Sequence, residues 1–181
     1  MSDGISGVSG VDRPSSSSYS PTDNSPDASG NSGSPVPGQT GKQGPAGPAN
    51  GQYDQYIDSA AKKYGVDPAL VKGVMAQESQ GNTYAESPAG AEGLMQIKPD
   101  TASALAGRDV TAAELQNNPE LNIDLGTKYL AQMISEKGSV ADGLGAYNQG
   151  PDADWQSIPE SQAYVKSIMD AVDNGTLPNW S

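Results

Sequence analysis

The chain has 181 residues, a formal net charge of −12, and neither cysteine nor histidine. Without cysteine it can form no disulfide, thiolate metal site or thiol nucleophile; without histidine it lacks the base of Ser-His and Cys-His enzymes and the usual ligand of catalytic zinc. The negative charge argues against binding to nucleic acid or to an anionic membrane. We expect no metal and no cofactor, so an enzyme made of these residues must use carboxylates, hydroxyls, amides, lysines or backbone groups.

Residues 1–50 differ in composition from the rest of the chain. More than half of them are Ser, Gly or Pro, and Tyr19 is the single aromatic residue among them. Such a stretch buries too little apolar surface to offset the chain entropy lost on folding. The sequence predicts a disordered tail over 1–50 and one compact domain over 51–181.

The sequence favours neither a membrane span nor a secretory signal. The first ten residues contain neither the basic start nor the apolar stretch of a signal peptide. No run approaches the roughly 18 apolar residues of a membrane-spanning helix. We expect no membrane insertion, and a monomer.

Helical periodicity dominates residues 51–181. Apolar residues recur every three or four positions, starting at caps such as Asp67-Pro68, the capping box that begins at Thr111, and Asn118-Pro119. Pro99 is interpreted as the end of a short run over 94–97. The expected helices, in chain order, cover 53–64, 67–80, 101–105, a segment starting at 111, 118–138, 140–147 and 160–172. This pattern predicts an all-α fold of six or seven helices, with a Gly-, Ser- and Pro-rich loop over 81–93.

Glu78 stands out in the second expected helix. The apolar stripe of that helix includes Val74, and the next position on the same face, four residues on, is Glu78. Partial burial and the negative end of a helix both favour the neutral form of a carboxyl group, which a general acid needs. The alternative is that the helix turns at its end and leaves Glu78 in solvent, and periodicity alone does not separate the two.

Four blocks of residues around and after Glu78 follow one another in a characteristic order. The first contains Glu78-Ser79, Ser87, Gly90-Ala91-Glu92-Gly93-Leu94-Met95-Gln96 and Pro99-Asp100-Thr101-Ala102. The others are Asn122-Ile123 with Gly126 and Tyr129-Leu130, then Ala146-Tyr147-Asn148-Gln149-Gly150-Pro151, then Glu160 with Tyr164-Val165. Over residues 53–172 this order resembles the soluble lytic transglycosylases of the goose-lysozyme-like superfamily. The resemblance implies a lysozyme-like helical catalytic domain.

The resemblance also implies a reaction on peptidoglycan glycan strands. Glu78 matches the family's catalytic glutamate, which protonates the glycosidic oxygen between N-acetylmuramic acid and N-acetylglucosamine. The carboxylate then accepts the proton of the muramic acid C6 hydroxyl, which attacks C1 and leaves a 1,6-anhydro end. One carboxylate therefore suffices, whereas most glycosidases use two.

Further positions match family residues with supporting roles. The resemblance implies saccharide contacts for Ser87, Met95, Gln96, Tyr147 and Asn148, with the Tyr147 hydroxyl close to the catalytic carboxylate. Supporting roles fall to Ser79, Glu160 and Tyr164. Plainer interpretations remain open: Ser79 as a hydroxyl bonded to backbone at the helix end, Met95 and Tyr164 as core residues, and Glu160 as a first-turn acid.

The sequence departs from the family pattern close to Glu78. Gly81 stands where the family commonly has an aromatic residue, and Tyr84 is a candidate to take its place. Glu86 and Glu92 flank the motif as candidate second carboxylates, but as loop residues they are expected to be solvated.

The sequence also leaves alternatives for the location of the protein and for its function. The tail resembles export regions of type III secretion substrates, which favours a route to the periplasm and cell wall in contact with a secretion apparatus; a phage virion component is the alternative. The rival functions are a muramidase that uses water and a peptidoglycan-binding component with little turnover.

Overall fold

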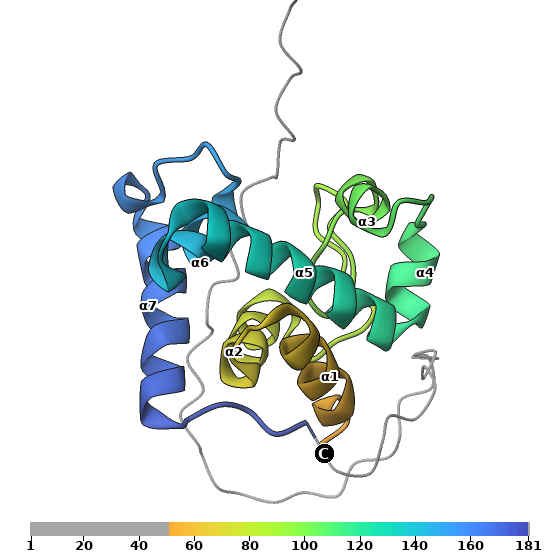
Figure 1. The fold of residues 1–181 in the computed structure, drawn as a ribbon, viewed down its shortest axis with the longest axis horizontal. Helices are drawn as coiled ribbons and strands as arrows, with labels where there is room; N and C mark the ends of the chain where they lie inside the picture. Colours follow the sequence, from red (N-terminus) through yellow and green to blue (C-terminus); the bar gives the residue numbers. More distant parts are fainter. Residues whose placement is uncertain (1–50, 181) are drawn as a thin grey trace, which may run out of the picture.

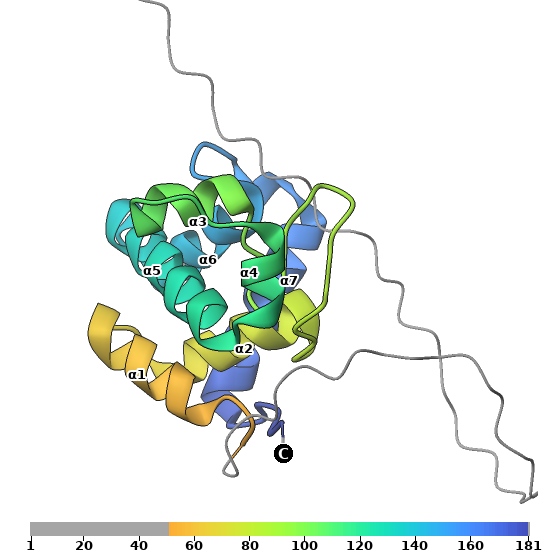
Figure 2. The same ribbon diagram turned by 90° about the vertical axis from the view of Figure 1, so that its right-hand side faces the viewer.

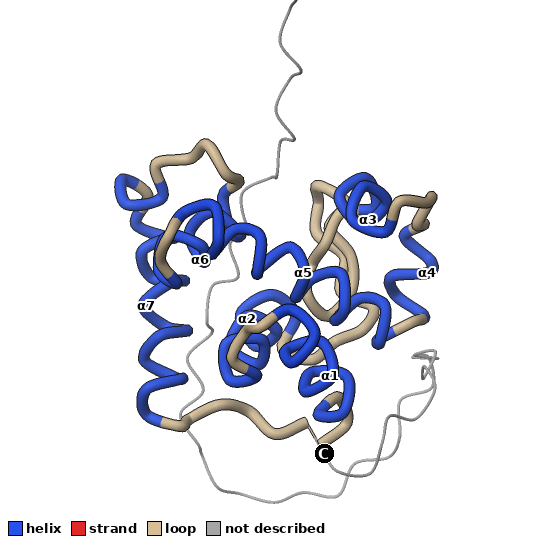
Figure 3. Tube along the Cα trace, viewed as in Figure 1, coloured by secondary structure: helices blue, strands red, loops and turns tan. Residues whose placement is uncertain are grey.

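The computed structural model describes residues 51–180, and the predicted tail over 1–50 lies outside them. The elements are α1 (Asp54–Tyr64), α2 (Pro68–Ser79), α3 (Pro99–Ala106), α4 (Ala112–Asn117), α5 (Pro119–Lys137), α6 (Val140–Gln149), the 3-10 helix η1 (Trp155–Ser157) and α7 (Pro159–Asn174). Within the described residues there is no strand, only two isolated bridges that pair Glu92 with Glu86 and with Ile97 (Figure 3). The all-α fold class is confirmed.

The helix ends follow the sequence signals closely. The Asp67 carboxylate accepts a hydrogen bond from the Ala69 N–H at 2.8 Å, and Thr111 and Glu114 form the expected capping box of α4. The exception is Pro99, which begins α3 instead of ending the preceding run. A proline fits the first position of a helix because its missing N–H would have no partner there.

Helix α5 runs through the middle of the fold and separates two groups of buried side chains (Figures 1 and 2). The main core joins α1, α2, α5, α6 and α7, and a smaller one lies between α3, α4 and the other side of α5. Ile123 of α5 lies in the first core and Leu125, two positions on, lies in the second. The loop between α2 and α3 spans both groups, because Leu94 and Met95 lie in the main core and Ile97 lies in the smaller one.

Helices α2 and α7 approach each other closely at Gly73. A Cβ atom at Gly73 would lie 2.8 Å from Cγ2 of Ile168, so only glycine allows this spacing without a shift. This contact brings the first half of α7 alongside the end of α2, where Glu78 lies.

Candidate active site

Glu78 lies in the last turn of α2 and is half-buried. The stripe predicted to face the core does so, since Leu70, Val71, Val74 and Met75 are all buried. The helix ends at Ser79, and the next residue, Gln80, takes the left-handed conformation with φ of 53° and donates its N–H to the Met75 carbonyl. The interpretation that leaves Glu78 fully in solvent is therefore excluded.

A tyrosine from the last helix holds the Glu78 carboxylate. The Tyr164 hydroxyl on α7 donates a hydrogen bond to Oε1 of Glu78 at 2.8 Å, across 86 residues of sequence. Tyr164 also packs against the main core, as its helical spacing indicated. Helical spacing favoured the core role and the family resemblance implied a supporting one, but nothing in the sequence says which core side chain will direct its hydroxyl towards Glu78.

Ser79 connects the end of α2 to the following loop. Its hydroxyl donates to the Leu94 carbonyl at 2.7 Å, lies 3.3 Å from the Met75 carbonyl oxygen, and accepts from the Gly81 N–H at 3.2 Å. The interpretation of Ser79 as a hydroxyl bonded to backbone at the helix end is confirmed, and these bonds join the residue after Glu78 to the loop over 81–98.

Met95 is a core residue in this structure, which corrects the expected saccharide contact. Its exposed fraction is 0%, and its side chain lies against the backbone of Gly126, where a Cβ atom would approach the methionine Sδ to 2.7 Å. A saccharide cannot reach a side chain that is covered on every side.

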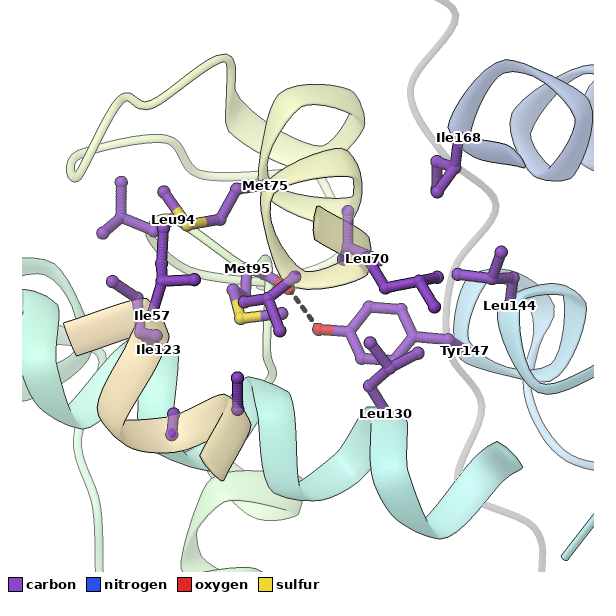
Figure 4. Close-up of a cluster of buried hydrophobic side chains, with 14 of the residues drawn as sticks. Ile57, Leu70, Met75, Leu94, Met95, Ile123, Leu130, Leu144, Tyr147 and Ile168 are labelled. Carbon is purple, nitrogen blue, oxygen red and sulfur yellow. Dashed lines mark hydrogen bonds between the residues drawn. The ribbon is translucent and has the colours of Figure 1, made fainter. Parts of the chain in front are cut away.

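Tyr147 is likewise buried, and its hydroxyl is hydrogen-bonded. It donates to the Met95 backbone oxygen at 2.7 Å (Figure 4), and the Tyr164 hydroxyl donates to Glu78. Tyr147, at 1% exposed, thus fixes the turn over 93–96 from α6. Asn148 beside it is also buried and accepts a hydrogen bond from the Gln149 side chain at 2.7 Å.

Gln96 and Ser87 organise the loop between α2 and α3. The Gln96 amide nitrogen donates to the carbonyls of Ala85 at 2.9 Å and Gly93 at 3.1 Å, and the residue has a φ of 46°. The half-buried Ser87 accepts from the Ala91 N–H at 2.9 Å. Gln80 and Gln96 are the non-glycine residues with positive φ among residues 51–180, and such backbone is concentrated at functional sites.

Glu160 lies exposed in the first turn of α7, where the helix dipole favours its charge. It is one turn before Tyr164, and the first-turn interpretation accounts for its place.

Glu86 is exposed as expected, but Glu92 is not: its exposed fraction is 4%, and it accepts a hydrogen bond from Gln116 at 2.6 Å. The expectation of a solvated Glu92 is wrong because its backbone pairs with Glu86 and Ile97, which turns the side chain inwards towards α4.

Asn122 belongs to the second block of the family resemblance but received no role from the sequence, yet it holds the loop in place. It is fully buried on α5; its amide oxygen accepts from the Met95 N–H at 2.8 Å, and its nitrogen donates to the carbonyls of Glu92 and Leu115 at 2.9 and 3.2 Å. The signal that could have found it is a lone amide next to Ile123 in an otherwise apolar stripe.

Gly81 is covered by an aromatic residue, although not by the expected one. A Cβ atom at Gly81 would collide with the indole of Trp180, near the end of the chain. Tyr84, the candidate named from the sequence, is half-buried in the loop. Trp180 is too distant in sequence for any local pattern to assign it to this place.

Two further properties concern the described part of the chain. Residues 51–180 contain no cluster of three or more acidic side chains that could hold a metal ion. None of their helices combines the length and the hydrophobicity that crossing a bilayer requires.

Comparison with known proteins identifies similar sequences. Residues 55–169 match the family model described as the transglycosylase SLT domain. A membrane-bound lytic murein transglycosylase C of Actinobacillus pleuropneumoniae is 43% identical over 94 residues, which cover 47% of this chain and 25% of that protein. A transglycosylase of Enterobacteria phage PRD1 is 36% identical over 119 residues, which cover 65% of this chain and 42% of the phage protein.

Solved structures give the same result for the fold. The 70 kDa soluble lytic transglycosylase of Escherichia coli has a TM-score of 0.62 at 25% identity, over 71% of this chain and 25% of that one. Lytic transglycosylase Slt of Pseudomonas aeruginosa has a TM-score of 0.58 at 27% identity, over 65% of this chain and 23% of that one. This chain therefore spans less than half the length of each of these relatives.

Proposed function

Because residues 55–169 match its model, this chain belongs to the transglycosylase SLT domain family, and we propose that it is a peptidoglycan lytic transglycosylase. The observation that carries the proposal is the Glu78 carboxylate at the end of α2, half-buried and hydrogen-bonded to Tyr164 at 2.8 Å. A half-buried carboxyl group that a tyrosine hydroxyl orients can serve as both acid and base. The names of the relatives, lytic murein transglycosylases among them, support the same reaction class.

In the proposed mechanism Glu78 performs both proton transfers. Its neutral carboxyl gives its proton to the glycosidic oxygen as the bond from C1 of N-acetylmuramic acid breaks. The resulting carboxylate takes the proton of the C6 hydroxyl while that oxygen bonds to C1, which closes the anhydro ring and restores the acid. Tyr164 holds Oε1 throughout, which fixes the orientation of the carboxyl group relative to the substrate.

The remaining residues are proposed to shape the site and not to transfer protons. Ser79 and Tyr147 fix the turn over 93–96 through the carbonyls of Leu94 and Met95. We retain Ser87, Gln96 and Asn148 as proposed saccharide contacts. Peptidoglycan glycan strands are the proposed partner.

The test is substitution of the proposed acid and base. We expect Glu78→Gln to lower muropeptide release from purified sacculi by at least about 100-fold, the lower range for loss of general acid–base catalysis. Glu136→Gln removes an exposed carboxylate at the far end of α5 and should retain full release. Release by Glu78→Gln at the wild-type rate would overturn the proposal.

Mass spectrometry of the released fragments separates the rival functions. We expect 1,6-anhydromuramoyl ends. Reducing muramic acid ends would instead indicate a muramidase, and saturable binding to sacculi without any release, by the wild type or by Glu78→Gln, would indicate a binding component.

We propose that the protein acts in the periplasm or cell wall and that residues 1–50 direct its export through a type III secretion apparatus. The composition of residues 1–50 supports that route, whereas the phage PRD1 relative supports the virion alternative. A reporter fused behind residues 1–50 should be exported by cells with the apparatus and retained by cells without it. Equal retention in both strains would favour the virion interpretation.

A further inference from the structure

Residues 175–180 leave α7 and run back past α2 to the start of α1, and we name this segment the C-terminal strap (Figures 1 and 2). Its far end is attached to the segment just before α1, because the Gln52 N–H donates to the Trp180 carbonyl. Its middle contacts α2: a Cβ atom at Gly73 would lie 3.7 Å from Cδ2 of Leu177. The strap lies outside residues 55–169, the part of the chain that matches the family model.

Trp180 contacts the two residues that follow the helix of Glu78. Its indole ring covers Gly81, and its Nε1 donates to the Gln80 carbonyl at 3.1 Å. Tyr53 of the adjacent segment lies with its ring centroid 6.3 Å from that of Trp180, and its hydroxyl donates to the Gly81 carbonyl at 3.3 Å. Both carbonyls after the helix are thus bound by aromatic side chains from distant parts of the chain.

The backbone at this point needs external support. Gln80 and Gly81 both have positive φ, 53° and 81°, and the left-handed conformation costs a non-glycine residue about 1–2 kcal/mol. Helix ends also fray readily, and Glu78 lies only one residue before the end of α2. A frayed last turn would carry the Glu78 carboxylate away from the Tyr164 hydroxyl.

We propose that Trp180 is a positioning residue for Glu78. By binding Gln80 and covering Gly81 it keeps the last turn of α2 closed, so that Glu78 stays at hydrogen-bond distance from Tyr164. The consequence for activity rests on the proposed function, in which Glu78 is the acid and base. The structural consequence, a closed helix end, does not depend on that function.

The kinetic test compares two alanine variants of the strap in the full chain. Trp180→Ala removes the contact with residues 80 and 81, whereas Leu177→Ala removes the contact with the middle of α2. On soluble peptidoglycan fragments, well below the unfolding temperature of each variant, we expect Trp180→Ala to lower kcat about tenfold with KM changed less than twofold. Leu177→Ala should leave kcat within twofold, and Trp180→Phe, which keeps a ring but loses the indole N–H, should fall between the wild type and Trp180→Ala.

Equal kcat values for the wild type, Trp180→Ala and Leu177→Ala would overturn the proposal, because they would reduce Trp180 to a contributor to stability. A loss confined to KM would also overturn it, because Trp180 would then bind substrate and not position Glu78.

Amide hydrogen exchange tests the structural part without any activity. The N–H groups of Gln80, Gly81 and Asn82 donate to Met75, to the Ser79 hydroxyl and to the Ser79 carbonyl, at 3.1, 3.2 and 3.0 Å. We expect Trp180→Ala to speed their exchange about tenfold and to leave Val74 and Met75 unchanged. Wild-type exchange at residues 80–82 in this variant would overturn the positioning role, whereas full activity of Glu78→Gln would overturn only the proposed function.

Discussion

At the scale of single residues, the hydrogen bond from Tyr164 to Glu78 is the contact on which the proposed chemistry depends most directly. It joins the last helix to the end of the second, with the Tyr164 hydroxyl oxygen 2.8 Å from Oε1 of Glu78. A neutral donor of this kind orients the carboxylate without adding a charge to the site.

Tyr164→Phe tests this contact. We expect kcat to fall roughly 10- to 100-fold, since a hydrogen bond to a charged group contributes about 1.5–3 kcal/mol. Circular dichroism should show an unchanged helical fold, because the ring keeps its place beside the core. Tyr56→Phe removes the hydroxyl of another half-buried tyrosine, on α1, and serves as the control; an equal loss of kcat in both variants would contradict the role of Tyr164.

Glu92 should make stability depend on pH. Burial raises the pKa of Glu92, the hydrogen bond from Gln116 opposes that shift, and the charge of Glu86 adds to it. The folded state therefore favours protonated Glu92, and the associated stability is present at low pH and is lost as the pH rises through the raised pKa. We expect Glu92→Gln to gain stability relative to the wild type as the pH rises. The difference in the free energy of unfolding, variant minus wild type, should be more positive at pH 7 than at pH 4.

Urea titrations at the two pH values measure this difference. Glu136→Gln, which changes an exposed carboxylate, should show almost no difference between them. The same relative free energy for Glu92→Gln at both pH values would mean that Glu92 titrates normally.

Sequence reasoning located Glu78 on the core face because α2 has a regular apolar stripe. It left Met95 open between a saccharide contact and a core residue, and it misplaced Glu92, because the loop over 80–98 has no such periodicity; this loop is held by hydrogen bonds to distant partners, Asn122 and Gln116 among them. The sequence could therefore predict which residues lie in and around this loop, but it could not predict whether each side chain points into the core or towards solvent.

At the scale of elements, the caps and stop signals predicted the helices well. Asp67, Thr111 and Asn118 each cap the helix assigned to them, and Gly138 ends α5 in the left-handed conformation. Packing between helices was not visible in the sequence. The close approach of α2 and α7 depends on a glycine in the middle of a helix, which the pattern alone marks only as a poor helix former.

Gly73→Ala tests that approach. The added Cβ would lie 2.8 Å from Cγ2 of Ile168, so we expect a loss of about 1–3 kcal/mol in the free energy of unfolding, as for other overpacked sites. Denaturant titration measures it. In an Ile168→Ala background the opposing methyl is gone, and Gly73→Ala should lower the free energy of unfolding by less. Equal losses in both backgrounds would mean that the contact between residues 73 and 168 does not cause the loss.

At the scale of the whole molecule, α5 determines how the site is assembled. It carries Asn122 towards the loop after α2 and contributes to both cores, while α6 and α7 pack against each other on its far side. The residues that meet near Glu78 therefore come from both halves of the matched region, and the domain must fold as one unit to form the site. The order of motifs predicted this assembly through family resemblance; periodicity alone predicted only the helices.

The two tryptophans each lie over a glycine, and their fluorescence can report changes in two separate parts of the structure. Trp155 covers Gly145 and donates its indole N–H to Asp142, whereas Trp180 covers Gly81. Hydrogen bonds from Ser139 and Trp155 lower the pKa of Asp142, so acidification through that lowered value should change the fluorescence of Trp155 and leave that of Trp180 unchanged. A Trp155→Phe protein would carry Trp180 as its one tryptophan, against the helix end that holds Glu78, and the tryptophan emission, excited at a wavelength that tyrosine does not absorb, would report the opening of that end in real time.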